Sequence, residues 1–229
     1  MKAALVVMGD ALLDRDLVGT SSRLCPEAPV PVVDVACEQL RPGGAALAAL
    51  LAAGDGRPTV LVTALGDDEA AAEVRRLLGA AGVEVVDLGL AGPTPEKTRV
   101  LADGHLVVRV DRGDDRGPVG AWTAAAADAI DGGGAVLVAD YGRGVAAVDG
   151  ARRALGRLAS RTPVVWDPHP RGPEPVPGAR LVTPNRREAA AAVGIGGEGL
   201  AADAARAKLL ARRWQAAAVA ITRGADRVV

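Results

Sequence analysis

The sequence contains no phenylalanine, and aromatic residues make up only 2% of its 229 residues. Lysine is also scarce, occurring only at positions 2, 97 and 208, so that arginine supplies nearly all the positive charge. We attribute this composition to the codon bias of a high-GC genome and not to an arginine-rich binding surface. The formal net charge of −1 provides no overall field that would attract nucleic acid or an anionic membrane.

Cysteine occurs only at positions 25 and 37, a spacing that matches no zinc motif. Two ordinary thiols in a reducing compartment are the simplest interpretation. No apolar run reaches the ~18 residues of a membrane span, and the N-terminus lacks the pattern of a secretory signal. We therefore expect a soluble, cytoplasmic protein, whose hydrophobic content of 49% is enough for a sizeable core.

The most informative stretch is 41–54, which reads Arg-Pro-Gly-Gly followed by an Ala/Leu-rich run that ends at Gly54. The pattern predicts a helix that begins directly after Gly43 and Gly44. Paired glycines remove side chains at the start of a helix, so a ligand can approach backbone N–H groups where the helix dipole favours negative charge. A tight turn that merely uses glycine is the alternative.

Short apolar runs alternate with helical patterns along the rest of the chain. Buried strands are predicted at 3–8, 59–65, 83–86, 135–139, 163–166, 180–183 and 217–222, with helices at about 67–81, 119–130, 145–159, from 185 and at 200–215. This alternation predicts one α/β domain with a mostly parallel sheet that is covered on both faces.

Two aspartates, Asp10 and Asp14, follow the first predicted strand. Ligands of open α/β sheets bind beyond the carboxyl ends of the strands, and one carboxylate can hold two hydroxyls of a polyol. A turn or helix cap is the alternative for both residues, and more so for Asp10.

A small second sheet, or lid, is predicted from two insertions at about 15–41 and 94–112. Residues 98–102 and 105–111 are predicted to form a hairpin around Asp103-Gly104, a favoured two-residue turn. This turn places Thr98 opposite Arg109 and leaves His105 as a solvated neighbour. A further strand at 30–35 lies at an edge or outside the main sheet, since two prolines flank or interrupt it.

Two signals for a nucleotide compete. Gly142-x-Gly144-x-x-Ala147 matches the dinucleotide-binding pattern, and Asp167 ends the next predicted strand. This alternative is an NAD-dependent oxidoreductase.

The other signal is positional, because glycine, carboxylate and amide groups gather at strand ends and helix starts around one crevice. Phosphoryl transfer needs such positioning groups and a carboxylate or amide shell for magnesium. Asn185 and Glu188 also have the spacing of a capping box, which is their structural alternative.

The N-terminal motifs resemble those of the ribokinase-like (PfkB) carbohydrate kinases. They are Gly9-Asp10, Leu13-Asp14-Arg15, Pro26-Glu27-Ala28-Pro29-Val30-Pro31-Val32 and Arg41-Pro42-Gly43-Gly44. Further matches follow in family order: Lys97-x-Arg99, Arg109-x-Asp111, Asp140-Tyr141-x-Arg143-Gly144, Asp167-Pro168, Thr183-Pro184-Asn185-x-x-Glu188 and Thr222-Arg223. The likeness is greatest to the kinase domain of the bacterial heptose 7-phosphate kinase/heptose 1-phosphate adenylyltransferase proteins.

The resemblance implies a ribokinase-like three-layer α/β/α fold with a β-sheet lid, and ATP- and Mg²⁺-dependent phosphorylation of a sugar or sugar phosphate. By resemblance, Asp14 binds sugar hydroxyls, and Gly43 and Gly44 let the sugar pack against backbone. Candidate contacts for a substrate phosphate are Lys97, Arg99 and Arg109, whose alternative is a solvated lid face or a dimer interface.

The nucleotide side of the site is implied in the same way. Asn185 and Glu188 organise magnesium and its waters, with Glu188 as an indirect ligand, and Thr222 and Gly224 border the adenine nucleotide. The lid implies a homodimer, because family lids often bury apolar strand faces between protomers.

Two departures from the family pattern stand out. The family has asparagine where this chain has Leu47, which cannot replace a hydrogen bond to the sugar. No Gly-Ala-Gly-Asp motif, the source of the family's catalytic base, occurs in the 229 residues, since Gly224-Ala225-Asp226 lacks the second glycine. We therefore expect the chain to be the N-terminal part of such a kinase, with a non-catalytic sugar-phosphate-binding and dimerising module or a truncated gene product as the alternatives.

The missing motif leads to a prediction for the isolated polypeptide. We expect the 229-residue chain to release ADP from ATP and a sugar phosphate at no more than the background rate, because it lacks a base to deprotonate the attacking hydroxyl. A coupled assay of ADP release measures this. Sugar-dependent release that is lost in Asp14→Asn would contradict the prediction.

Overall fold

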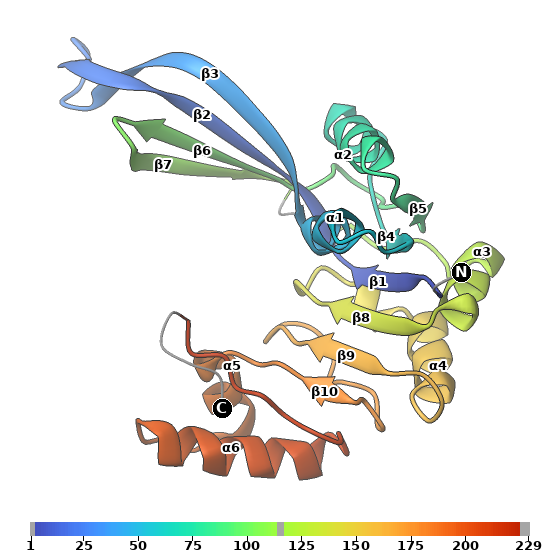
Figure 1. Ribbon diagram of the computed structural model, residues 1–229. Helices are drawn as coiled ribbons and strands as arrows, with labels where there is room; N and C mark the ends of the chain where they lie inside the picture. The colour runs from blue at the N-terminus through green and yellow to red at the C-terminus, as the bar shows by residue number, and fades with distance from the viewer. Residues whose placement is uncertain (1–2, 114–116, 225–229) are drawn as a thin grey trace.

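The computed structural model describes residues 3–113 and 117–224; Ala225 and Asp226 of the motif comparison lie outside the described residues. Its centre is a six-stranded sheet in which every described pairing is parallel. In spatial order the strands are β10 (Leu181–Val182), β9 (Val164–Asp167), β8 (Ala135–Ala139), β1 (Leu5–Gly9), β4 (Thr59–Thr63) and β5 (Glu84–Asp87) (Figure 1). The predicted parallel sheet is confirmed.

Helices cover both faces of this sheet and make three layers. On one face lie α1 (Ala45–Gly54) and α2 (Glu69–Ala80), and on the other α3 (Ala124–Gly132) and α4 (Asp149–Leu158). Alternate residues of β1 serve the two cores: Val7 packs with α1 and α2, while Val6 and Met8 pack with α3 and α4. Two further helices, α5 (Arg186–Val193) and α6 (Leu200–Arg213), lie near the β10 edge (Figure 1). No helix within the described residues is long and apolar enough to cross a membrane.

The lid is a separate four-stranded sheet that projects from the main body (Figure 1). Its strands lie in the order β3 (Pro31–Gly44), β2 (Ala11–Leu24), β6 (Glu96–Ala102) and β7 (His105–Arg112). The sequence pattern missed β2 altogether and placed only 30–35 of β3, so the lid begins before residue 15 and continues past 41. The expected edge position of the 30–35 segment is confirmed, because among the described strands β3 pairs with β2 alone.

The β6–β7 hairpin has the expected turn but a different register. Asp103 and Gly104 both have positive φ values, 52° and 80°, as the favoured two-residue turn requires. Arg99 lies opposite Arg109, so the prediction that Thr98 faces Arg109 was wrong. The cause is a bulge, because Val107 has no partner on β6 and shifts the pairing by one residue.

The predicted strand at 217–222 is also wrong in detail, since the segment forms only isolated parallel bridges, Val182↔Val219 and Asn185↔Thr222. Its hydrogen bonds to β10 begin as a ladder: the Ala220 N–H donates to the Val182 carbonyl at 2.9 Å. Pro184 has no N–H to donate back to the segment, so the ladder is interrupted there.

The helix starts differ from the sequence estimates for local reasons. The helix expected from 119 begins at Ala124, where the Thr123 hydroxyl accepts the N–H of Ala126 at 3.2 Å. After Gly144 there is only a short 3₁₀ turn, η1 (Val145–Ala147), before α4 begins at Asp149.

Lid and main sheet meet at one crossing, where Gly44 ends β3 and precedes α1. Gly44 has φ 62° and ψ −135°, and a Cβ there would lie 2.4 Å from the Asp10 carbonyl oxygen. That same oxygen accepts the N–H of Ala45 at 3.0 Å. Only glycine fits this close approach, so the glycine before α1 has a backbone reason as well as any ligand-binding reason.

We expect Gly44→Ala to lower the free energy of unfolding by about 1–3 kcal/mol, because alanine is strained at this φ and its Cβ would strike the Asp10 carbonyl. Gly79→Ala is the matched control. Gly79 lies inside α2 with open space around its Cβ position, so alanine there should raise the free energy of unfolding by about 0.5–1 kcal/mol. Denaturant titration of both variants measures the difference, and equal effects would contradict the prediction.

Candidate functional site

The carboxyl ends of β1, β8, β9 and β10 carry the polar groups of the site. Asp10 follows β1, Asp140 follows β8, Asp167 ends β9, and Asn185 comes shortly after β10. Parallel strands deliver these residues to the same edge of the sheet, below the lid, as the rule for open α/β sheets predicts.

Asp10 is a structural anchor at this edge. Its carboxylate is buried and accepts the backbone N–H groups of Tyr141, Arg143 and Val145, each at 3.0 Å. The turn after β8 is therefore built around Asp10, which is the turn or cap role given as the alternative for this residue. Within the Gly142-x-Gly144 segment the Arg143 N–H donates to Asp10 and the Gly142 N–H donates to Asp140, so these groups are not available to a dinucleotide pyrophosphate.

Asp140 lies beside this turn in a buried position. One oxygen accepts the Gly142 N–H at 2.7 Å, while the other, Oδ2, has no hydrogen-bond partner within the described residues. Gly172 packs against it so tightly that a Cβ would lie 1.7 Å from Oδ2. Burial, reinforced by the charges of Asp10 and Asp167, raises the pKa of Asp140 to about 7. Sequence reasoning quoted Asp140 as a motif match without giving it a role.

Asp14 lies on the lid face with its carboxylate held by lid side chains. The Arg99 guanidinium donates to Asp14 at 2.6 Å and to Asp16 at 3.5 Å, and the hydrogen bond to Asp14 raises the pKa of Arg99. Arg41 pairs with Asp16 at 2.8 Å. Arg99 thus orients Asp14, and its expected contact with a substrate phosphate stays a prediction.

Gly43 packs directly against Asp14. A Cβ on Gly43 would lie 2.5 Å from Asp14 Oδ2 and 2.3 Å from a methyl group of Leu12. The start of α1 behind it has no side-chain cap and no acidic residue in its first turn. Carboxylate, bare glycine backbone and helix N-terminus therefore lie close together, and their expected contact with a sugar stays a prediction.

A basic cleft of about 250 Å³ opens between the lid and the strand ends. It is lined by Leu12, Lys97, Arg109, Asp111, Tyr141, Arg143, His169 and Arg171. Arg109 pairs with Asp111 at 2.9 Å. The side-chain cations of Lys97 and Arg171 have no ion-pair partner within the described residues.

The sequence pointed to only part of this cleft. Lys97 and Arg109 were expected there, whereas Arg143 was quoted only as a motif match. Arg171 was missed entirely, because it lies in a proline-rich loop where no periodicity marks its direction.

A second cleft, of about 460 Å³, adjoins the first, since His169 lines both. It contains Asn185 and Glu188, which form the predicted capping box. Asn185 Oδ1 accepts the N–H groups of Arg187 and Glu188, each at 3.0 Å. In turn, the Glu188 carboxylate accepts the Asn185 N–H at 2.7 Å. Burial, with the charge of Asp167, raises the pKa of Glu188.

Within the described residues no three His, Cys, Asp or Glu side chains gather closely enough to hold a metal ion directly. One carboxylate, Glu188, beside a second, Asp167, nevertheless suits Mg²⁺, which usually keeps several waters and binds through one or two carboxylates plus phosphates. The residues therefore fit a magnesium ion that is held indirectly.

Thr222 lies beside this cleft, because its N–H donates to the Pro184 carbonyl at 3.0 Å and it bridges to Asn185. Gly224 is exposed, with φ 64°. Of the two residues expected to border a nucleotide, Thr222 thus lies near Asn185, and the expected role of both stays a prediction.

The pKa of Asp140 leads to a prediction about stability and pH. Between pH 5 and pH 7 the folded protein must lose the Asp140 proton, whereas the unfolded chain has already lost it near pH 4. The wild type should therefore lose about 2–3 kcal/mol of unfolding free energy relative to Asp140→Asn on going from pH 5 to pH 8. Denaturant titrations at the two pH values measure the difference. Asp131→Asn, at an exposed ion pair, is the control; parallel pH dependence in the wild type and Asp140→Asn would contradict the assignment.

Comparison with known proteins agrees with this geometry. A family model described as pfkB family carbohydrate kinase matches residues 2–229. The "Bifunctional protein HldE" of Streptomyces coelicolor is 54% identical over 226 residues, covering 97% of this chain and 47% of that protein. Its counterpart in Azorhizobium caulinodans is 41% identical over 230 residues, covering 96% of this chain and 48% of that protein. The chain thus spans about half the length of the curated relatives it matches.

Solved structures support the same fold. Ribokinase of Arabidopsis thaliana, determined with ribose and ATP, superposes with a TM-score of 0.69 at 18% identity, covering 100% of this chain and 77% of that one. Phosphofructokinase-2 of Escherichia coli, in a tetrameric inhibited form, gives a TM-score of 0.66 at 13% identity, covering 100% and 79%. The dinucleotide-dependent oxidoreductase is overturned by the family match and by the filled N–H groups around Asp10. Fold, site and sequence relatives together place this chain in the pfkB family of carbohydrate kinases.

Proposed function

We propose that this chain forms the substrate-binding and magnesium-positioning part of a sugar-phosphate kinase of the heptose 7-phosphate type, acting with ATP and Mg²⁺ in the cytoplasm. The observation that carries the proposal is the basic cleft, because Lys97 in its wall is the register partner of Asp14 on the neighbouring lid strand. A sugar held by Asp14 would therefore lie close to cations that can neutralise its phosphate group.

The sugar side of the proposed site has three parts. Asp14 accepts hydrogen bonds from sugar hydroxyls, and Arg99 fixes the direction of its carboxylate. Gly43 carries no side chain, so the Asp14 carboxylate and Leu12 can pack against its backbone, and we propose that the sugar ring lies beside this stretch. Lys97 and Arg171 bind the substrate phosphate, because they bring cations that have no ion-pair partner within the part of the chain the structure describes.

The nucleotide side lies across His169, in the cleft of Asn185 and Glu188. Bound magnesium and ATP would supply the transferable phosphoryl group and the charge that steadies it. The chain's own part is to orient the metal's waters through Glu188 and to keep the start of α5 in place through the capping box. The 229 residues hold no Gly-Ala-Gly-Asp motif, so their proposed role does not include proton abstraction.

The proposal includes a homodimer formed through the lid. Apolar side chains stand exposed on its strands and connecting turn: Leu24, Val30, Val35, Leu106, Val107, Val108 and Val110. Exposed β-strand faces of this kind usually meet a partner. Sedimentation analysis distinguishes a dimer from the aggregating monomer that a truncated gene product would give.

Binding measurements test the substrate assignment without requiring turnover. We expect heptose 7-phosphate to bind at least about tenfold more tightly than the unphosphorylated heptose, because hydrogen bonds to charged groups contribute about 1.5–3 kcal/mol. Lys97→Met and Arg171→Met should each remove most of this preference while leaving the affinity for the unphosphorylated sugar unchanged. Calorimetric titration measures both affinities.

Lys208→Met is the matched control, since Lys208 is an exposed lysine on α6 that does not line the basic cleft. Asp14→Asn should weaken both sugars alike, because it removes a hydroxyl acceptor and leaves the cations. Equal affinities of the wild type for the two sugars would contradict a phosphate-selective site.

A further inference from the structure

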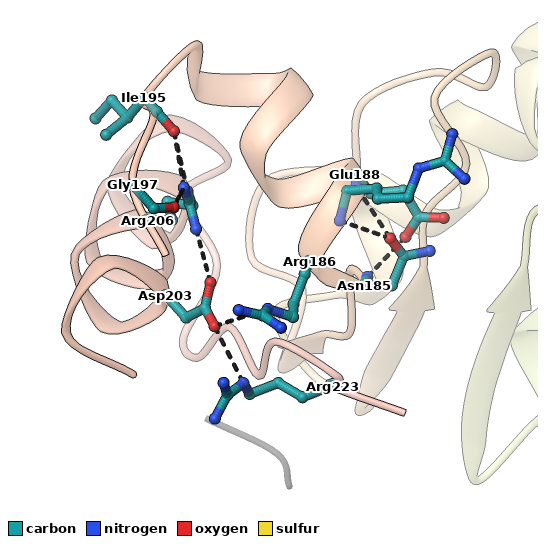
Figure 2. Close-up of polar contacts among 9 residues, drawn as sticks. Asn185, Arg186, Glu188, Ile195, Gly197, Asp203, Arg206 and Arg223 are labelled. Atoms are coloured by element: carbon teal, nitrogen blue, oxygen red, sulfur yellow. Dashed lines mark hydrogen bonds and ion pairs between the residues drawn. The ribbon is translucent and has the colours of Figure 1, made fainter. Parts of the chain in front are cut away.

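A buried carboxylate, Asp203, lies behind the proposed magnesium cleft in a part of the chain to which the kinase motifs assign no role. Asp203 belongs to the first turn of α6 and its side chain is 0% exposed. Arg206, one turn further on and almost equally buried, donates to Asp203 Oδ1 at 2.7 Å (Figure 2). A buried charge is costly unless it is paired, and Arg206 pairs with Oδ1, whereas Oδ2 has no hydrogen-bond partner within the described residues.

Arg206 also fixes the loop between α5 and α6. Its Nε and Nη2 donate to the Ile195 carbonyl at 3.1 and 3.0 Å, and Nη2 also reaches the Gly197 carbonyl at 2.5 Å (Figure 2). Asp203 is therefore held in a fixed place by its own helix and by the loop that enters it.

The second oxygen of Asp203 faces two further arginines that come from other segments. Arg186 Nε and Arg223 Nε each lie 3.2 Å from Oδ2 (Figure 2). These contacts are ion pairs without hydrogen-bond geometry, because Oδ2 and the buried Arg223 Nε have no hydrogen-bond partner within the described residues. Stability alone requires only one cation for one carboxylate, yet three converge here. The two additional arginines are not needed to balance the charge of Asp203, and the position of their segments suggests another role.

Both segments border the proposed nucleotide site. Arg186 directly follows Asn185, and Arg223 directly follows Thr222. Asn185 and Thr222 are bridged through the backbone, and Asn185 with Glu188 forms the capping box. One fixed carboxylate thus holds the residue next to the start of α5 and the residue at the end of the 217–222 segment.

We infer that Asp203 is a positioning residue for the magnesium–nucleotide edge: through Arg186 and Arg223 it sets the place of the Asn185–Glu188 capping box and of Thr222. The inference rests on the proposed function for the ligand and on the observed ion pairs for the coupling. It assigns Asp203 no contact with substrate, so loss of its charge should act on nucleotide binding and leave sugar-phosphate binding alone.

The test uses the full chain and two variants. Asp203→Asn removes the charge from the centre of the cluster, and Arg186→Gln removes one link while keeping the buried Asp203–Arg206 pair, so that a variant remains if the first does not fold. Arg161→Gln, at an exposed ion pair with Asp131, is the matched control. Calorimetry measures the affinity for ADP with and without Mg²⁺. A separate titration measures the affinity for heptose 7-phosphate. Hydrogen exchange follows the amides of Arg187, Glu188 and Thr222.

We expect Arg186→Gln to raise the dissociation constant of Mg²⁺·ADP about tenfold, the size of effect typical of residues that orient metal ligands. The heptose 7-phosphate affinity and the magnesium-free ADP affinity should not change. The three amides should exchange faster in Arg186→Gln, and the control should match the wild type in every measurement.

Unchanged amide exchange in Arg186→Gln would overturn the inference, and so would faster exchange with unchanged Mg²⁺·ADP affinity, which would leave the cluster a purely structural role. A wild-type chain that binds heptose 7-phosphate but no Mg²⁺·ADP would refute the nucleotide half of the proposed function and the nucleotide role of Asp203 with it. A wild-type chain that binds Mg²⁺·ADP but shows no preference for the phosphorylated sugar would refute the proposed substrate alone.

Discussion

The hydrogen bonds of Asp10 are the constraint on which the rest of this structure depends. Its carboxylate accepts three backbone N–H groups from the turn after β8, and its carbonyl accepts the first N–H of α1. Asp10 is also the residue between β1 of the main sheet and β2 of the lid. One residue therefore joins sheet, lid, helix and turn, and Asp14 and Gly43, which we propose bind the sugar, take their places from that junction.

Charge is distributed unevenly around the site that this junction creates. Toward β9 and β10 the carboxyl groups are crowded and poorly solvated, and burial raises the pKa of Asp140, Asp167 and Glu188. Under the lid, in contrast, Lys97 and Arg171 leave an excess of positive charge. A divalent cation suits the first region and a phosphate suits the second, and His169 lies between them.

The same physical logic explains how a glycine motif can mislead. Gly142-x-Gly144 follows a strand and precedes a helix, as a dinucleotide site requires, and both glycines have positive φ. The N–H groups of that turn, however, point at a carboxylate of the protein itself. An internal anion, Asp10, takes the place that a pyrophosphate would occupy, so the motif here shapes the backbone and does not bind a dinucleotide.

The sequence by itself determined the features that depend on neighbours a few residues apart. The alternating strands and helices, the capping box of Asn185 and Glu188 and the turn at Asp103-Gly104 all follow from local hydrogen bonding and local backbone preference. The tertiary structure decided the rest. Strand β2 was missed because Asp14 and Asp16 interrupt its apolar pattern, and their charges are balanced by Arg99 and Arg41 on neighbouring strands.

Arg171 and Asp203 were beyond sequence reasoning for the same reason. Their significance lies in partners and clefts assembled from segments far apart in the chain, and no local spacing encodes those distances. Ion pairs between distant segments form only once the hydrophobic core has brought the segments together. The chain order therefore predicts which groups are available, and the fold alone decides which of them meet.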